Sequence, residues 1–205
     1  FDPENWQRIA PPTEIDLSLA AFETAQDQTT GEIYGAFYNS DLTKREFGVV
    51  DFENETRTTF GTTDKAYVEL GLSTDGYLYG IATDGNLYKI DKTNGTETLI
   101  GSTGIELTDA EGSYYSQSGE IDQKTNTLYW ASVDNAQQSA LYTVDLATGA
   151  VTKISDFPNG DIVLALTVPK PLAEAGAPAA AEELSVAFNE ASLSGKVNFK
   201  AQTKT

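Results

Sequence analysis

Acidic side chains supply almost all of the chemistry that this sequence offers. Its 205 residues include 31 Asp and Glu but no His and no Cys. Thiolate nucleophiles, Cys/His zinc sites, His-dependent triads and imidazole acid–base catalysis are therefore excluded. A glycosidase needs only two carboxylates at a suitable separation, so the loop cluster Glu106, Asp109 and Glu111 is considered for catalysis. We interpret this cluster as a solvated charged segment and assign no catalytic residue.

Four aspartates recur at matching places along the chain and resemble candidate metal ligands. Each precedes a turn in which Asn or Gly occupies the tight position; they are Asp2, Asp51, Asp91 and Asp145. An Asp side chain at such a place accepts hydrogen bonds from the backbone N–H groups of the turn. The residue recurs in every repeat, whereas a binding site should occur once. We therefore predict a capping role, no metal site and no cofactor.

Aromatic side chains outside the repeated pattern are the better candidates for ligand binding. Tyr79, Tyr88, Tyr129 and Tyr142 recur at matching positions and are predicted to pack between repeats. The other aromatics are accompanied by polar side chains that can bond to hydroxyl groups, a combination that suits a sugar ring. The predicted ligand-binding residues are Tyr38, Tyr114, Tyr115, Trp130, Asp134 and Asn135.

Three segments of the chain repeat one pattern, and this pattern determines which elements hold the candidate residues. Tyr34, Tyr79 and Tyr129 mark the same place in the three segments, 45 and 50 residues apart. Propeller blades recur at about 40–50 residues, and each contains four short antiparallel strands. Runs rich in Tyr, Val, Ile and Thr alternate with Gly and Asn turns, and no sustained helical period occurs before residue 170.

We therefore predict an all-β fold, a β-propeller-like array of four-stranded antiparallel blades. Three blades are complete, with inner strands at 15–22, 66–72 and 113–121, and they are flanked by partial blades at 1–9 and 161–168. Closed propellers need about four to eight blades, so we expect further blades upstream. The absence of Met and the start at Phe1 favour the same expectation. The longest loops, at 38–45, 102–113 and 131–140, should emerge on one face and carry the binding residues.

The composition changes after Pro169, which divides the chain into three parts. Residues 1–169 form the partial β-propeller-like repeat domain, and 170–182 form a Pro/Ala linker. Residues 183–205 contain two alternating runs that predict the truncated start of a fibronectin-III-like module, which needs about 100 residues in full.

The charge of the chain limits its partners. A net charge of −18 argues against nucleic acid, whose phosphates require Lys and Arg. No apolar run reaches the roughly 18–20 residues that a membrane helix needs, so we expect no membrane insertion. Exposed strand edges near Ile9 and Ile162 would permit self-association.

The repeats, the junction Val168-Pro169-Lys170-Pro171-Leu172-Ala173 and the tail from Leu184 to Thr205 resemble Bacteroidetes cell-surface proteins. In those proteins a propeller-like repeat region precedes fibronectin-type-III-like modules and a cleaved-adhesin or choice-of-anchor domain. The resemblance implies export, an extracellular or cell-surface location and a role in adhesion or glycan capture. It brings no catalytic motif.

Taken together, these features predict a non-enzymatic binding or adhesion module at a surface. It would recognise a glycan or a protein through the long-loop face of the propeller. One alternative is a structural spacer that has no ligand. The other is a carbohydrate-active enzyme that uses paired carboxylates.

Overall fold

The computed structural model describes residues 21–39, 43–52 and 54–168 in full, and the backbone of 182–189 and 194–200. The chain divides into two compact units, 1–168 and 169–205. Among the described residues, the first unit consists of strands and turns with one short 3-10 helix at Pro158–Gly160. None of the described helices is long and apolar enough to cross a membrane.

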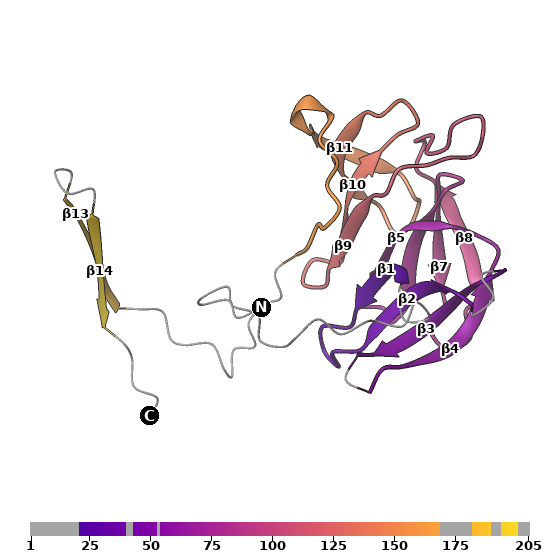
Figure 1. Ribbon diagram of the computed structural model, residues 1–205, viewed down its shortest axis with the longest axis horizontal. Helices are drawn as coiled ribbons and strands as arrows, with labels where there is room; N and C mark the ends of the chain where they lie inside the picture. The colour runs from indigo at the N-terminus through magenta and orange to yellow at the C-terminus, as the bar shows by residue number, and fades with distance from the viewer. Residues whose placement is uncertain (1–20, 40–42, 53, 169–181, 190–193, 201–205) are drawn as a thin grey trace. The chain divides into compact units, whose positions relative to one another are not determined.

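Three four-stranded antiparallel sheets make up the first unit, which confirms the predicted fold class (Figure 1). In each sheet the strands are hydrogen-bonded in chain order, as in a meander. The first sheet contains β1 (Ala21–Gln26), β2 (Ile33–Tyr38), β3 (Arg45–Asp51) and β4 (Thr56–Thr63). The second contains β5 (Tyr67–Leu72), β6 (Leu78–Ala82), β7 (Asn86–Ile90) and β8 (Glu97–Ser102). The third contains β9 (Ser118–Asp122), β10 (Thr127–Val133), β11 (Ser139–Val144) and β12 (Val151–Asp156).

The first strands of consecutive sheets lie next to one another, which is the arrangement of propeller blades. β1 contacts β5, and β5 contacts β9. Every residue of β5 is buried because the middle sheet is covered on both sides, whereas β1 and β9 keep partly exposed residues. Phe47 packs on Tyr67 between the first two sheets, with 5.5 Å between ring centroids. Ile121 and Trp130 belong to a second cluster that joins the other two sheets.

The outer strand of one sheet touches the last turn of the next sheet at a pair of glycines. A Cβ atom on Gly61 of β4 would lie 2.5 Å from the Cα atom of Gly95, in the β7–β8 turn. A Cβ atom on Gly101 of β8 would lie 2.1 Å from the carbonyl oxygen of Thr148, beside Gly149 in the β11–β12 turn. Gly95 and Gly149 also have positive φ angles of 71° and 78°, which favour glycine. The junction between neighbouring sheets therefore requires glycine on both sides.

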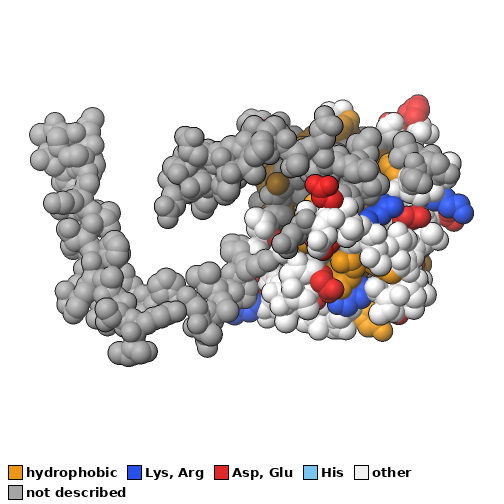
Figure 2. Space-filling model, turned by 60° about the horizontal axis from the view of Figure 1, so that its bottom comes forward, with side chains coloured by type: hydrophobic (Ala, Val, Ile, Leu, Met, Phe, Trp, Pro, Cys, Tyr) orange, Lys and Arg blue, Asp and Glu red, His pale blue; other side chains and the backbone are white. Residues whose placement is uncertain are grey.

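The surface carries charges of both signs. On the face seen in Figure 2, basic and acidic side chains lie next to one another, and hydrophobic side chains form small separate areas. Ion pairs with N–O distances of 2.8–3.3 Å join Arg57 to Glu46, Lys65 to Glu97 and Lys89 to Asp75. The second unit contains one antiparallel hairpin, β13 (Glu182–Asn189) with β14 (Ser194–Lys200).

Two of the four predicted inner strands occur where the sequence predicts them, but the prediction of an inner strand at 161–168 is wrong. β5 falls within the predicted range 66–72, and β9 overlaps the end of the predicted range 113–121. β1 begins near the end of the predicted range 15–22. Residues 161–168 form no strand. They are held by side chains of β9 instead: the Ser118 hydroxyl donates to the carbonyl of Val163 at 2.8 Å and accepts from the N–H of Leu166 at 3.0 Å. The predicted partial blade at 1–9 lies outside the described residues. So does the predicted linker at 170–182, except for Glu182, with which β13 begins.

Candidate functional site

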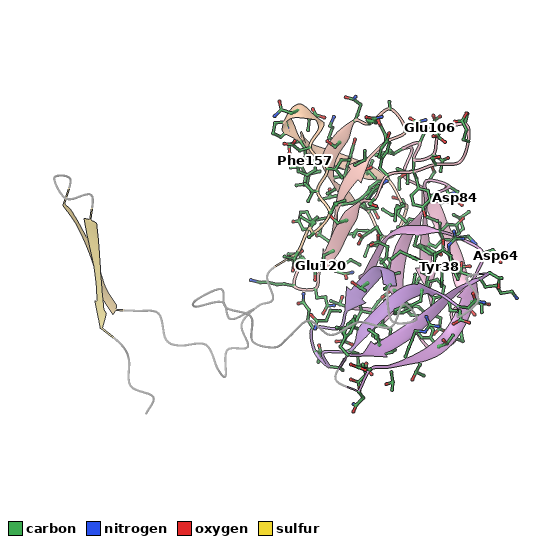
Figure 3. The ribbon with its side chains drawn as sticks, viewed as in Figure 1. Tyr38, Asp64, Asp84, Glu106, Glu120 and Phe157 are labelled. Atoms are coloured by element: carbon green, nitrogen blue, oxygen red, sulfur yellow. The ribbon has the colours of Figure 1, made fainter. Side chains whose placement is uncertain are left out.

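The meander topology brings the longest connections to one end of the sheets. In an antiparallel meander, the connections from second to third strand and from fourth strand to the next sheet emerge at the same end. The connections β2–β3, β8–β9 and β10–β11 are all of these two kinds. In Figure 3, Asp64, Asp84 and Glu106 mark this side of the molecule, while Glu120 of β9 lies away from it. We refer to this end as the loop face.

A small pocket lies on the loop face between the β8–β9 and β10–β11 connections. It has a volume of about 120 Å³ and is lined by Asp109, Ser113, Tyr114, Tyr115 and Asn135. Tyr114 is 44% exposed and forms an isolated antiparallel bridge with Thr108. The pocket thus combines two aromatic rings with a hydroxyl, a carboxyl and an amide. We call it the tyrosine pocket.

Hydrogen bonds within and between the two loops fix the walls of the tyrosine pocket. The Asp109 carboxylate accepts from the N–H of Ser113 at 2.7 Å, which closes the turn before Tyr114. The N–H of Asn135 donates to the carbonyl of Glu106 at 2.9 Å, and the Asn135 amide donates to the Glu106 carboxylate at 3.1 Å. The walls are therefore in place without a ligand.

The structure brings together three of the six predicted binding residues: Tyr114, Tyr115 and Asn135 line the tyrosine pocket. Asp134 is beside it, where its carboxylate accepts from the N–H of Gln138 at 2.7 Å and closes the loop. Tyr38 belongs to the first sheet and is 38% exposed. Its ring packs edge-on against Phe22, with 4.7 Å between centroids.

Trp130 is a core residue and does not reach the loop face. Its side chain is 0% exposed and packs 6.0 Å from the ring of Tyr142. The equivalent positions in the other sheets are Gly35 and Gly80, and in both sheets an aromatic ring covers the glycine. A Cβ atom would lie 2.8 Å from Phe37 in the first case and 2.5 Å from Tyr67 in the second. Trp130 fills with its own ring the space that a neighbouring ring fills elsewhere.

The repeated aspartates cap turns, as predicted, wherever they are described. Asp51, Asp91 and Asp145 accept hydrogen bonds from the backbone N–H groups of Asn54, Thr93 and Ala147, at 2.7–3.0 Å. The Thr93 hydroxyl also donates to the Asp91 carboxylate at 2.6 Å, and this bond, followed by the one from the Thr93 N–H, holds the pKa of Asp91 below its ordinary value. Asp2 lies outside the described residues. In the predicted catalytic cluster, Glu106, Asp109 and Glu111 are all exposed.

A second and larger cavity lies along the inner strands. Its volume is about 380 Å³, and its walls come from β1, β5, β9 and residues 164–167. Glu23, Gln117 and Glu120 line it, and none of the described lining residues is Lys or Arg. Glu69 lies directly behind one wall, because a Cβ atom on Gly119 would be 2.6 Å from its carboxylate. We refer to this space as the inner cavity.

Sequence reasoning missed these glutamates, although one signal was present. Glu69 is the single charged residue in an otherwise apolar inner strand, Tyr67–Leu72. It is 1% exposed, and burial followed by the charge of Glu120 raises its pKa well above the ordinary value. Burial and then the charge of Glu69 raise the pKa of Glu23 to about 10. The inner cavity is therefore a region where negative charge is unfavourable.

Several solved structures are similar to the chain. A protein of unknown function from Bacteroides thetaiotaomicron VPI-5482 matches 63% of it with a TM-score of 0.50 and 12% identity. A DUF4784 family protein from Bacteroides caccae ATCC 43185 matches 87% with a TM-score of 0.41 and 12% identity. TolB from Acinetobacter baumannii matches 65% with a TM-score of 0.37 and 12% identity. The chain covers only 32%, 43% and 43% of those three chains.

No curated protein matches the sequence. A family described as a repeat of unknown function (DUF6923) matches residues 38–166. The matched range runs from the end of β2 to the segment beside β9, so it includes most of the three sheets and both walls of the tyrosine pocket. It is more than half of the 205 residues. The chain therefore belongs to the DUF6923 family of repeats.

Proposed function

We propose that this chain is a non-enzymatic binding module that recognises a glycan through the tyrosine pocket. The observation that carries the proposal is the convergence of Tyr114, Tyr115 and Asn135 on one pre-formed pocket at the loop face. Aromatic rings offer an apolar surface to the C–H face of a sugar, and the Asn135 amide and Ser113 hydroxyl can bond to its hydroxyl groups. Binding sites commonly occupy loops that a rigid scaffold holds in place.

The size of the tyrosine pocket restricts the ligand. Clefts for drug-sized molecules measure about 300–1,000 Å³, and this pocket measures about 120 Å³. We therefore propose that it takes one sugar unit at the end of a chain. A single amino-acid side chain on a partner protein would be the other ligand of suitable size.

We further propose that the module works outside the cell, in a Bacteroidetes adhesin-like protein. The similarity in fold to a Bacteroides protein and the Pro/Ala junction before the β13–β14 hairpin support this setting. In this proposal the three sheets are blades of a propeller. The hairpin begins a fibronectin-III-like module, and cleaved-adhesin or anchor modules follow.

A glycan array probed with the whole chain tests the proposed function. We expect binding to a restricted set of glycans, and loss of that binding in Tyr114→Ala and in Asn135→Ala. Phe52→Ala is the matched control, because Phe52 is 50% exposed but lies in the β3–β4 connection at the opposite end of the sheets. An array with no signal would favour the spacer. Equal binding by parent and pocket variants would place recognition elsewhere.

A further inference from the structure

Another hollow in the surface lies on the middle sheet, at the end opposite the loop face. It has a volume of about 400 Å³ and is formed by the β5–β6 connection, β7, the β7–β8 connection and β8. In a meander, the connections from first to second strand and from third to fourth strand emerge at the end that the loop face does not use. We call this hollow the sheet groove. Its lining residues are Tyr77, Lys89, Asp91, Asn94, Thr96 and Thr98.

Two of the lining side chains occur in the middle sheet and not at the same places in the other two sheets. These are Tyr77, which precedes β6, and Lys89, which pairs with Tyr79. When the sheets are aligned by strand pairing, the positions of Tyr77 and Lys89 hold Glu32 and Val49 in the first sheet, and Thr127 and Thr143 in the third. A residue that the fold requires recurs in every repeat, whereas a residue that serves a binding site occurs once. Tyr77 is thus a further aromatic residue outside the repeated pattern.

The Tyr77 ring is held in place and remains accessible to a ligand. The Lys89 ammonium lies 3.8 Å from the ring centroid, and an ion pair with Asp75 at 2.8 Å fixes it there. A cation placed over one face of an aromatic ring is attracted by the ring and leaves the opposite face for a ligand. Tyr77 is 38% exposed. A ring of this kind offers an apolar surface to the C–H face of a sugar.

Hydrogen-bonding groups lie in the sheet groove together with this ring. Thr98 in β8 and Thr96 two residues before it are both exposed. Within the described part of the chain, neither hydroxyl has a hydrogen-bond partner. The Asn94 amide donates one N–H to the Asp91 carboxylate at 3.1 Å, which leaves its second N–H for a ligand. The sheet groove therefore offers two hydroxyls and an amide N–H to the hydroxyl groups of a ligand.

We propose that the sheet groove binds a neutral saccharide, with Tyr77 against the sugar ring and the Thr96 and Thr98 hydroxyls bonded to its hydroxyl groups. A neutral ligand suits the charges of the lining, because the Lys89 ammonium is paired with Asp75 and the Asp91 carboxylate accepts from backbone N–H. A volume of about 400 Å³ lies within the range of small-molecule clefts, about 300–1,000 Å³. This site is separate from the tyrosine pocket and does not depend on a ligand there.

The open form of the sheet groove predicts weak and rapidly reversible binding. Four of its six lining residues are exposed, so a ligand would bury little surface there. We expect a dissociation constant on the order of 10⁻³ M. With an association rate constant of about 10⁵–10⁷ M⁻¹s⁻¹, such a complex dissociates within about 10 ms and is lost when a glycan array is washed. The site is therefore measured in solution.

Titration of the whole ¹⁵N-labelled chain with maltotriose, cellotriose and triacetylchitotriose, followed by NMR, tests the proposal. We expect at least one of these neutral trisaccharides to shift the backbone amide signals of Tyr77, Thr96 and Thr98 in a saturable way. Tyr77→Ala should abolish the shifts at the two threonines. Thr98→Val removes one exposed hydroxyl and keeps the shape of the side chain, so it reports on the groove even if Tyr77→Ala does not fold. It should weaken binding about two- to tenfold, the effect of one hydrogen bond.

Thr152→Val is the matched control. Thr152 pairs with Thr143 as Thr98 pairs with Lys89, so it holds the same place in the third sheet, where the aromatic residue and the lysine are absent. This variant should bind as the parent does. Tyr114→Ala, which alters the tyrosine pocket, should also leave the groove signals unchanged, so the two proposed sites are tested independently. Three results would overturn the proposal: no saturable shift at the groove with any of the three trisaccharides, shifts confined to the loop face, or equal affinity in the parent and both groove variants.

Discussion

At the scale of single residues, the acidic side chains of this molecule divide by their surroundings. Asp91 and Asp145 lie in exposed turns, where their carboxylates are solvated and accept hydrogen bonds from backbone N–H groups. Glu69 has the same kind of charged group but sits in a fully buried strand, beside Gly119. A buried carboxyl without a counter-charge holds a proton more tightly than it does in water. The stability of the fold should therefore depend on pH through Glu69.

We predict that replacing Glu69 by Gln makes the stability of the protein less sensitive to a rise in pH above about 5. The pKa of Glu69 in the folded protein is raised above its ordinary value of 4.5. Its protonated form therefore stabilises the fold fully below the unfolded pKa, and this stability is lost as pH rises towards the folded pKa. Each pH unit in that window costs up to about 1.4 kcal/mol. Glu69→Gln keeps the neutral form throughout.

Urea unfolding of chelator-treated protein at several pH values between about 5 and 8 measures how the free energy of unfolding depends on pH. The free energy of unfolding should fall more steeply with pH in the parent than in Glu69→Gln. Glu111→Gln is the control for the general loss of one negative charge, and it should follow the parent. Parallel pH profiles for the parent and Glu69→Gln would contradict the prediction.

Trp130 shows where residue-level prediction from sequence reaches its limit. The repeat has glycine at this position in the other two sheets, so a tryptophan there looks like an addition for function. In a strand, however, Trp130 shares a face with the buried Leu128 two residues earlier. Packing between strands decides which aromatic ring fills the space over that face. The sequence of one repeat does not show which ring this is. Tyr114, Tyr115 and Asn135 were predictable because they lie in long loops.

At the scale of elements, the three sheets repeat details that are finer than strand order. The pairing of the third and fourth strands shifts register at the same place in each sheet, after Phe47, Leu87 and Leu141. The residue opposite that position is Gly61, Gly101 and Ser155 in turn. The two glycines contact the turn of the following sheet, and Ser155 is exposed.

We predict that Gly101→Ala destabilises the protein by about 1–3 kcal/mol, the usual cost of forcing an added methyl group into a packed contact. The new Cβ atom would lie 2.1 Å from the carbonyl oxygen of Thr148, which belongs to a turn held by its own hydrogen bonds. Ser155→Ala is the matched control at the same register position in an exposed strand, and it should change stability by less than about 0.5 kcal/mol. Urea unfolding of both variants measures the difference, and equal effects would contradict the role of the glycine pair.

The strands were predictable from sequence to the extent that their residues alternate with Gly and Asn turns. Residues 161–168 have the same apolar character but form no strand. Their hydrogen bonds go to side chains of Ser118 and Glu120, including one from the N–H of Val168 to the Glu120 carboxylate. A strand requires a partner backbone in register, and the sequence of the segment itself does not show whether that partner is available.

At the scale of the whole molecule, the glycine pairs explain how one sheet joins the next. Gly61 meets Gly95, and Gly101 meets the turn of Gly149. At the corresponding place in its own last turn, the first sheet has Glu55, which adopts a positive φ of 53° although it is not glycine. The third sheet has Ser155 on its outer strand. If two separate molecules joined in the same way, the outer strand of one third sheet would bring Ser155 against Glu55 in the last turn of the other molecule's first sheet. A side chain would then lie on each surface where the junctions within the chain have glycine.

Charge, like these two side chains, opposes contact between separate molecules. The outer strands of the sheets carry Arg57, Glu97 and Lys153, and charged residues on edge strands oppose pairing with another chain. The net charge of −18 adds a general repulsion between molecules at low ionic strength. The segment near Ile162, which the sequence predicted as a free strand edge, offers no strand for pairing. These features oppose self-association at the described edges, and the predicted edge near Ile9 lies outside the described residues.

We predict that the chain is monomeric at low salt and remains so at about 1 M salt, where the Debye length is only about 3 Å. If general repulsion alone kept the molecules apart, screening would release self-association, whereas a steric block at the junction does not depend on salt. Light scattering over a range of protein concentrations distinguishes the two cases. A double variant, Glu55→Gly with Ser155→Gly, removes both side chains from the junction and should associate at high salt. Thr74→Gly, a substitution to glycine in an exposed turn of the middle sheet, should not. A rise in mass for the parent at high salt would show that charge rather than the junction side chains limits assembly.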